Sequence, residues 1–183
     1  MGNRADPDGV LTKVPAGRFR GRAITVTTDR TLVLVNDLAL QLAPEAIGPS
    51  DASRVFVAGH CLVRMTLAEL ALPRAGMIWA DFRHSASLAA LNGVVQAAGG
   101  LDRLVLAAEG EQGETVFAVM CAVLTLLPSL RRRGSGRIEL ICTAGGATGS
   151  LVQFVERIRP GLKRDRIELS LEILERREDR AAA

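Results

Sequence analysis

The stretch "SLRRRGSGRIELICTAGG" at residues 129–146 combines the end of a helix, a turn and a strand. The arginines Arg131–Arg133 suit a helix C-terminus, where cations complement the helix dipole, and Gly134 is typical of the position just after a helix. The apolar run 137–142 has the length of a buried strand. We therefore interpret the first glycines as structural rather than as an anion cradle, and we predict a helix–turn–strand unit that ends in a glycine loop.

The same alternation extends along the chain. Strand-length apolar runs alternate with longer segments of helical periodicity, which is typical of a parallel sheet covered by helices on both faces. We predict an α/β fold, a Rossmann-type doubly wound parallel sheet of about six strands. We further predict a flexible segment at 1–20, one Rossmann-like domain at 21–175 and a disordered tail at 176–183. The predicted strands are 22–27, 54–59, 77–82, 103–108, 137–142 and 166–174, and the predicted helices are 33–43, 62–72, 88–98 (capped by Ser85 or Ser87), 114–133 and 149–159.

Composition excludes several classes of function. The net charge is +3, and all but two of the 23 basic residues are arginines spread along the chain, which does not indicate a nucleic-acid-binding face. The longest apolar run, 116–128, is too short to cross a bilayer. The cysteines Cys61, Cys121 and Cys142 lie in apolar surroundings without paired spacing, as reduced thiols do. We expect a cytoplasmic protein without membrane or nucleic-acid partners.

Three stretches together resemble the short-chain dehydrogenase/reductase family. "LDRLVLAAEG" with the helix and strand that follow it, up to residue 146, is similar to the middle of that family. "WADFRHSASLAAL" and "RVFVAGHCLVRMTLAEL" resemble its preceding strand–helix units. The resemblance spans roughly residues 22–173 and implies the strand order 3-2-1-4-5-6, with the chain truncated after the sixth strand. It also implies that Asp81 corresponds to the family's adenine-contacting aspartate, although Asp81 could equally cap the next helix.

The residues that carry the family's chemistry differ here. The resemblance places the glycine-rich phosphate loop in "TTDRTLVLV" (27–35), which contains no glycine. It places the catalytic serine at Thr143, and it makes Thr115 the counterpart of the asparagine in the proton relay. We regard all these positions as vestigial. The vestigial cofactor positions are Thr28, Leu32, Leu34, Asp81, Ala107 and Glu109, of which Leu32, Leu34 and Glu109 are expected to crowd and charge the phosphate path.

The family's Tyr-x-x-x-Lys pair is missing. The chain contains no tyrosine, and its only lysines are Lys13 and Lys163. The family's spacing places the pair at Glu156 and Pro160, or at Gly145 and Gly149 if the connection is shorter. Neither set can do the job of that pair, in which the lysine ammonium lowers the pKa of a tyrosine that acts as general acid and base. We therefore expect no catalytic residue and no bound cofactor. We expect no metal site either, because His60 and His84 lack ligand spacing.

These observations favour a catalytically inactive protein that serves as an interaction or structural subunit. The alternatives are an NAD(P)-dependent oxidoreductase with an atypical nucleotide loop and a ligand sensor that uses the vacated pocket. The helix at 114–133 is apolar on nearly all sides, and a second apolar face indicates a partner. We expect that partner to be a second copy, as in a dimer, or an active paralogue. The predicted interface residues are Phe117, Met120, Leu124, Leu127, Val152, Phe154 and Val155.

Overall fold

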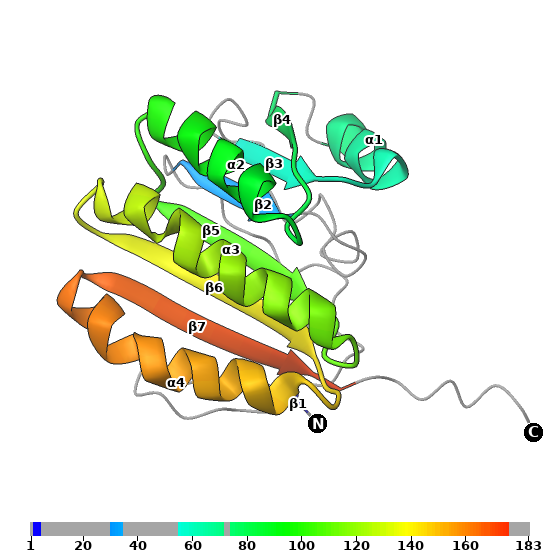
Figure 1. Cartoon of the computed structure of the whole chain (residues 1–183), viewed down its shortest axis with the longest axis vertical. Coiled ribbons are helices and arrows are strands. Elements are labelled where there is room, and N and C mark those ends of the chain that lie inside the picture. The colour runs from blue at the N-terminus through cyan, green and yellow to red at the C-terminus, as the bar shows by residue number, and fades with distance from the viewer. Residues whose placement is uncertain (1, 5–29, 35–54, 72–73, 176–183) are drawn as a thin grey trace, which may run out of the picture.

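A parallel sheet with the predicted strand order forms the centre of the molecule. The computed structural model describes residues 2–4, 30–34, 55–71 and 74–175. In this part of the chain seven strands form one sheet in the order β1-β7-β6-β5-β2-β3-β4 (Figure 1). All neighbouring strands except β1 and β7 are parallel, and from β2 onward their order is 3-2-1-4-5-6, which confirms the predicted α/β Rossmann-type fold. The parallel strands are β2 (Thr31–Leu34), β3 (Val55–Gly59), β4 (Gly76–Trp79), β5 (Arg103–Ala108), β6 (Gly136–Thr143) and β7 (Ile167–Leu174).

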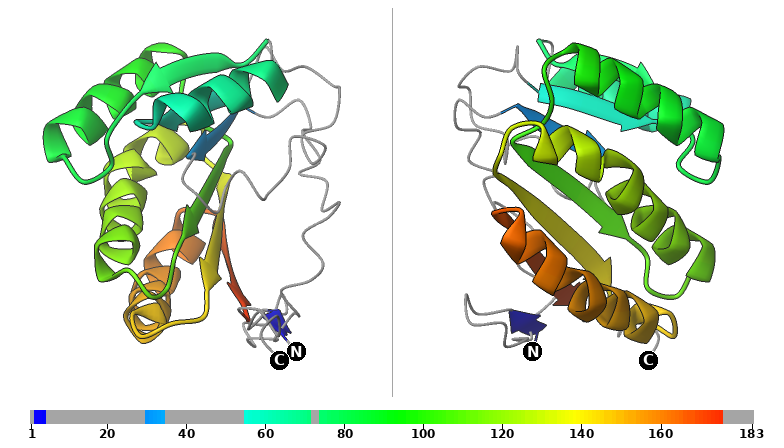
Figure 2. Two further views of the ribbon diagram at one scale, coloured as in Figure 1. Left: turned by 90° about the vertical axis from the view of Figure 1, so that its right-hand side faces the viewer. Right: turned by 60° about the vertical axis from the view of Figure 1, so that its left-hand side comes forward.

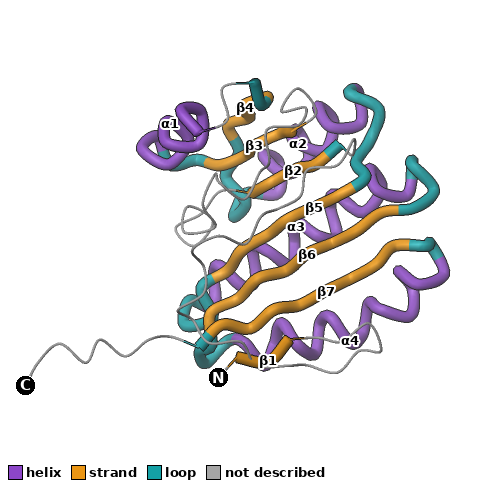
Figure 3. The backbone as a smooth tube through the Cα atoms, turned by 180° about the vertical axis from the view of Figure 1, so that it is seen from behind, coloured by secondary structure: helices purple, strands orange, loops and turns teal. Residues whose placement is uncertain are grey.

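Three helices form a layer on one face of the sheet. These are α2 (Ser85–Ala97), α3 (Gly113–Arg131) and α4 (Thr148–Arg164), which lie behind the strands in Figure 3. The helix α1 (Leu62–Ala71) lies outside this layer and packs beside β3 (Figure 2). By length and composition α3 could cross a membrane, but its inner side is buried in the core between the sheet and its neighbouring helices, so we assign it as the core helix of a globular fold.

Strand β2 corrects the predicted start of the domain. The sequence places the first strand at 22–27, the phosphate loop at 27–35 and a helix at 33–43. The structure instead forms a strand over Thr31–Leu34, paired with β3 and β5. Leu32 is fully buried in that strand, so apolar side chains that resembled a degenerate loop are core residues. Residues 22–27 and 35–43 lie outside the described residues.

Strand β1 (Gly2–Arg4) lies within the segment 1–20 that was predicted to be flexible, so the prediction is corrected for these three residues. These residues pair antiparallel with β7, with Asn3 opposite Ile173 and Arg4 opposite Glu172. A sheet edge offers unpaired N–H and C=O groups to any extended segment, whatever its side chains. The sequence "GNR" carries no apolar alternation and gave no signal of this pairing. The rest of 1–20 and the predicted tail lie outside the described residues.

The other elements lie close to their predicted positions, with two local differences. Helix α2 begins at Ser85, but its N-cap residue is His84, and neither predicted serine caps it with a side-chain bond. Helix α4 continues through Pro160 to Arg164 rather than ending at 159. Strand β7 keeps its predicted alternation, since Ile167 and Leu171 are buried while Glu168 and Ser170 are exposed. One face of β7 is therefore polar, as predicted, although β1 pairs with the side of β7 that was predicted to be the edge of the sheet.

The loops after β5 and β6 pack directly on each other. The Gly110 N–H donates to the Thr143 hydroxyl at 2.9 Å, and the Ala147 N–H donates to the Gly110 carbonyl at 2.8 Å. The Gly145 N–H donates to the Thr148 hydroxyl at 2.9 Å, and that hydroxyl donates to the Thr143 carbonyl at 3.2 Å. A Cβ on Gly145 would lie 2.7 Å from the Gly110 carbonyl oxygen, and a Cβ on Gly110 would collide with the Thr143 carbonyl. These two glycines are required by close backbone approach.

We predict that Gly145→Ala destabilises the protein by about 1–3 kcal/mol, because the added methyl forces two backbones apart. The measurement is the free energy of unfolding in urea, followed by circular dichroism. Gly146→Ala is the matched control, since a Cβ at Gly146 meets no atom within 4 Å. Equal stability of the two variants would contradict the packing described for these loops.

Candidate functional site

A cleft opens where the chain leaves the carboxyl ends of β3, β4 and β5. Its volume is about 230 Å³. Open parallel sheets bind ligands in this position, in the crevice beyond the carboxyl ends of strands where the strand order reverses. The cleft is smaller than the roughly 300–1,000 Å³ of pockets that hold a whole drug-sized ligand. Its lining residues are His60, Cys61, Arg64, Asp81, Phe82, Arg83, Leu106, Ala107, Glu109, Gln112, Glu114, Thr115, Ala118, Val119 and Ala122.

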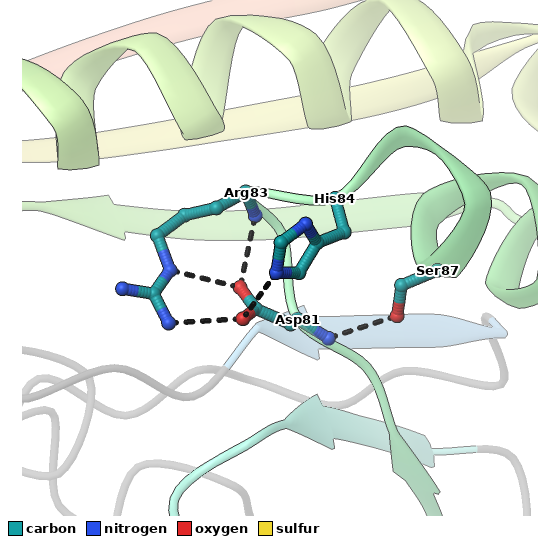
Figure 4. Close-up of polar contacts among 4 residues, drawn as sticks. All are labelled: Asp81, Arg83, His84 and Ser87. Atoms are coloured by element: carbon teal, nitrogen blue, oxygen red, sulfur yellow. Dashed lines mark hydrogen bonds and ion pairs between the residues drawn. The ribbon is translucent and has the colours of Figure 1, made fainter.

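Asp81, just beyond the end of β4, anchors one wall of the cleft. Its Oδ1 accepts both the backbone N–H and the Nε–H of Arg83 at 3.0 Å, and its Oδ2 accepts from Arg83 Nη2 at 2.9 Å (Figure 4). His84 Nε2 lies 3.5 Å from Oδ2, and the Asp81 N–H donates to the Ser87 hydroxyl at 2.9 Å. The bonds from Arg83 hold the pKa of the Asp81 carboxyl well below its usual range, against the opposing effect of burial.

Glu109 and the start of α3 form the opposite wall. Gln112 donates from Nε2 to Glu109 Oε2 at 2.6 Å, and the Thr115 hydroxyl donates to Gln112 Oε1 at 3.1 Å. Ala107, in β5, is 2% exposed and contributes to the apolar floor. The cleft therefore has an apolar floor between a carboxylate–arginine wall and a polar wall that includes a second carboxylate.

Most of the positions that were predicted to be vestigial, and that the structure describes, line this cleft. Asp81, Ala107, Glu109 and Thr115 all line it. Leu32 does not, because it is a core residue of β2. The expectation that Leu32 crowds a phosphate path is therefore wrong. Leu34 belongs to the same strand, but its side chain lies outside what the structure describes. Thr28 lies outside the described residues.

Thr143, the counterpart of the catalytic serine, has a structural partner. Its hydroxyl accepts the Gly110 N–H in the contact between the two loops. Of the two lysines, Lys13 lies outside the described residues and Lys163 is exposed near the C-terminal end of α4, roughly 22 Å along the helix from Thr148. Glu156 and Pro160 are exposed on α4. None of these positions brings a phenol or an amine to Thr143.

The cleft residues that were not predicted include four with polar or ionisable side chains beside β3 and β4, namely His60, Cys61, Arg64 and Arg83. A signal was present only for the backbone of Arg83, because an aspartate side chain can accept the backbone N–H two residues further on. Cys142 agrees with its prediction as an inert thiol, because burial raises its pKa to about 11. The described residues contain no group of three His, Cys, Asp or Glu side chains that could hold a metal ion.

The outer side of α3 is a second candidate site. Phe117 is 65% exposed and Leu124 is 53% exposed, and their spacing places them on one face of the helix. We call these two residues the α3 outer face. Val155 is 2% exposed, so its prediction as an interface residue is wrong: the amphipathic α4 turns it toward the core. The remaining predicted contacts are partly buried against the core, namely Met120, Leu127, Val152 and Phe154.

The fold is similar to many solved structures, although no protein-family model matches the sequence and no curated protein matches it. A short-chain dehydrogenase from Streptomyces avermitilis is 20% identical, with a TM-score of 0.62, over 79% of this chain and 65% of its own length. The F189W actinorhodin polyketide ketoreductase, solved with NADPH, is 21% identical, with a TM-score of 0.59, over 78% of this chain and 69% of its own. A metagenomic short-chain oxidoreductase, solved with NADP, is 17% identical, with a TM-score of 0.59, over 77% of this chain and 80% of its own length.

The expectation that no cofactor is bound is corrected. Two structures with a similar fold, the ketoreductase and the metagenomic oxidoreductase, were solved with NADPH and with NADP. One reason for the error is physical, since Leu32, which was expected to block the phosphates, is a buried residue of β2. The chain spans 65% of the length of the Streptomyces avermitilis dehydrogenase, and the strand order and helix layer match the expectation drawn from the three sequence stretches. This chain has the fold of the short-chain dehydrogenases/reductases.

Proposed function

We propose that the protein binds a nicotinamide dinucleotide in the cleft beyond β3, β4 and β5, and acts as a non-catalytic subunit in the cytoplasm. The observation that carries this proposal is the position of the cleft, which lies where ligands bind in doubly wound sheets. Similar structures solved with NADPH and NADP support the choice of ligand. The apolar floor around Leu106 and Ala107 suits a flat ring, and the polar walls supply hydrogen bonds to its edge.

The chemistry of the remaining residues supports a non-catalytic role. Carbonyl reduction needs a proton donor placed at the substrate oxygen, and in the resembling family a tyrosine supplies it. This chain has no tyrosine, and the Thr143 hydroxyl is engaged with Gly110. No glycine lies between Gly21 and Gly48, so the sequence on either side of β2 lacks the glycines that let a backbone approach a pyrophosphate closely. The cleft can thus hold part of a dinucleotide without the usual phosphate loop.

The α3 outer face supports association with a second copy or with an active paralogue. Fully burying a large apolar side chain contributes about 1.5–3 kcal/mol. Phe117 and Leu124 are large and exposed and lie two turns apart on one face of α3, and a two-fold pairing of α3 would bury both in each copy. Val152 and Phe154 on α4 lie partly buried beside the same layer and can extend the contact.

We predict that NADPH binds and that Thr115→Phe weakens its binding at least about tenfold, because the ring fills the cleft beside α3. Isothermal titration calorimetry measures the affinity. Thr66→Phe is the control, since Thr66 is exposed on α1 and does not line the cleft. Absence of NADPH binding to the unmodified protein at millimolar concentration would overturn the proposed ligand.

We predict that the NADPH-bound protein oxidises no NADPH in the presence of simple ketones, because no proton donor is placed beside Thr143. Absorbance of the reduced nicotinamide follows the reaction. Turnover that disappears in Thr143→Ala would identify a different proton relay and establish the alternative, an oxidoreductase with an atypical nucleotide loop.

We predict that Leu124→Glu dissociates the oligomer, because a charge on the α3 outer face cannot be buried without a partner. Multi-angle light scattering at micromolar concentration measures the mass, and circular dichroism checks the fold. Leu70→Glu is the matched control, since Leu70 is 75% exposed on α1 and far from the α3 outer face in sequence. An unmodified protein that is monomeric and has no co-purifying subunit contradicts this proposal.

A further inference from the structure

Basic residues gather in the two turns that lead into β6 and β7. Because α3 precedes β6 and α4 precedes β7, the C-terminal ends of both helices lie where these parallel strands begin. The turns have the sequences "RRRG" (131–134) and "KRDR" (163–166) and lie at the left of Figure 1. Arg131 joins them, since its guanidinium pairs with Asp165 at 2.7 Å. We call these two segments the basic turns.

The basic turns carry more cations than their ion pairs neutralise. Asp165 is the only carboxylate in either turn, and Arg131 already pairs with it. Arg133 pairs with Asp102 at 2.8 Å. The other cations of the basic turns are exposed, and none of them has an acidic partner among the residues that the structure describes. They are Arg132, Lys163, Arg164 and Arg166.

Arg166 has a backbone conformation that favours glycine. Its φ is 57°, and no other non-glycine residue in the described ranges has a positive φ. The two preceding helices are followed by glycines in this conformation, Gly99 with φ 97° and Gly134 with φ 77°. A Cβ disfavours the left-handed conformation. The helix dipole stabilises cations within the last turn, whereas Arg166 lies beyond the end of α4. Neither the backbone nor the dipole therefore explains an arginine at this position.

The side chains of the basic turns suit carboxylates better than a nucleic acid or a membrane. Arg131 and Arg133 already bind carboxylates within the chain. Neither turn contains an aromatic residue that could stack on a base. The large apolar side chains that are exposed in the described part of the chain belong to other segments, so the basic turns present none of them to a bilayer.

We propose that the basic turns bind an acidic segment of a protein partner. Arginine favours this recognition, because its planar guanidinium matches a carboxylate through two parallel hydrogen bonds. The basic turns lie where β6 and β7 begin, whereas the cleft lies beyond the carboxyl ends of β3, β4 and β5. The two sites are therefore at opposite ends of the strands. This interface goes beyond the proposed function and does not depend on a bound nucleotide.

The test measures binding of a rhodamine-labelled peptide of alternating glutamate and serine residues by fluorescence anisotropy. The unmodified protein is expected to bind this peptide at low salt and to lose affinity as the ionic strength rises, because exposed charges are screened. Arg132→Gln and Arg164→Gln are each expected to weaken binding about threefold. Arg74→Gln is the matched control, since it removes an exposed arginine in the turn before β4, at the far side of the sheet from β6 and β7.

Arg166→Gly separates binding from stability. Glycine adopts the left-handed conformation without a steric cost, so the melting temperature of this variant is expected to stay the same or rise. Its affinity for the glutamate peptide is expected to fall about threefold, because the cation is gone. An arginine kept only for structure would give the reverse, a lower melting temperature with unchanged affinity.

Several results overturn the proposal. One is the absence of peptide binding at low salt, and another is equal binding of an analogue with glutamine in place of glutamate. Equal weakening by Arg74→Gln shows a general effect of net charge, and unchanged affinity in the three variants of the basic turns excludes these turns. Tighter binding of duplex DNA or of phosphatidylserine vesicles than of the peptide assigns the turns to a nucleic acid or a membrane. All of these results leave the proposed nucleotide binding untouched.

Discussion

The pairing of β2 with both β3 and β5 is the constraint on which the rest of the structure depends. Thr31 is in register with Val55 on one side and with Arg103 on the other, and Leu32 lies between Phe56 and Leu104. The strand order reverses at this point, and doubly wound sheets bind ligands in the crevice beyond the carboxyl ends of the strands there. The described cleft lies beyond the carboxyl ends of β3, β4 and β5. The cleft is a consequence of strand order before any of its side chains is considered.

Much of this arrangement could be predicted from the sequence because its signals are local. Strand β5 matches its predicted span, and β6 and β7 are each within two residues of theirs, since each is an apolar run bounded by turn residues. The start of the domain could not be predicted in the same way. "RAITVT" and "TLVL" are both short apolar runs, and the pairing of the second with β3 and β5 depends on residues far away in the sequence. Strand β1 depends entirely on the edge of β7.

The residues of the candidate site also differ in whether the sequence could predict them. Asp81, Glu109 and Thr115 could be placed by resemblance, because each follows or faces a predicted strand end. The role of Arg83 could not, because its meaning arises from a bidentate contact that the sequence does not encode as a spacing of strands or helices. The same holds for Thr143. Its hydroxyl is retained, yet the Gly110 N–H makes it part of a loop contact that fixes the carboxyl ends of β5 and β6.

Helix α3 connects the two candidate sites. Its inner and N-terminal residues Thr115, Ala118, Val119 and Ala122 line the cleft, while Phe117 and Leu124 lie on the outer side of the same turns. A helix with its side chains is only about 10–12 Å in diameter, so a ligand in the cleft and a partner on the α3 outer face would contact one rigid element from opposite sides. Any shift of α3 that accompanies ligand binding therefore changes the surface offered to the partner, and by linkage the partner changes ligand affinity by the same factor. A subunit that worked in this way would need no proton relay, because its output would be the position of a helix.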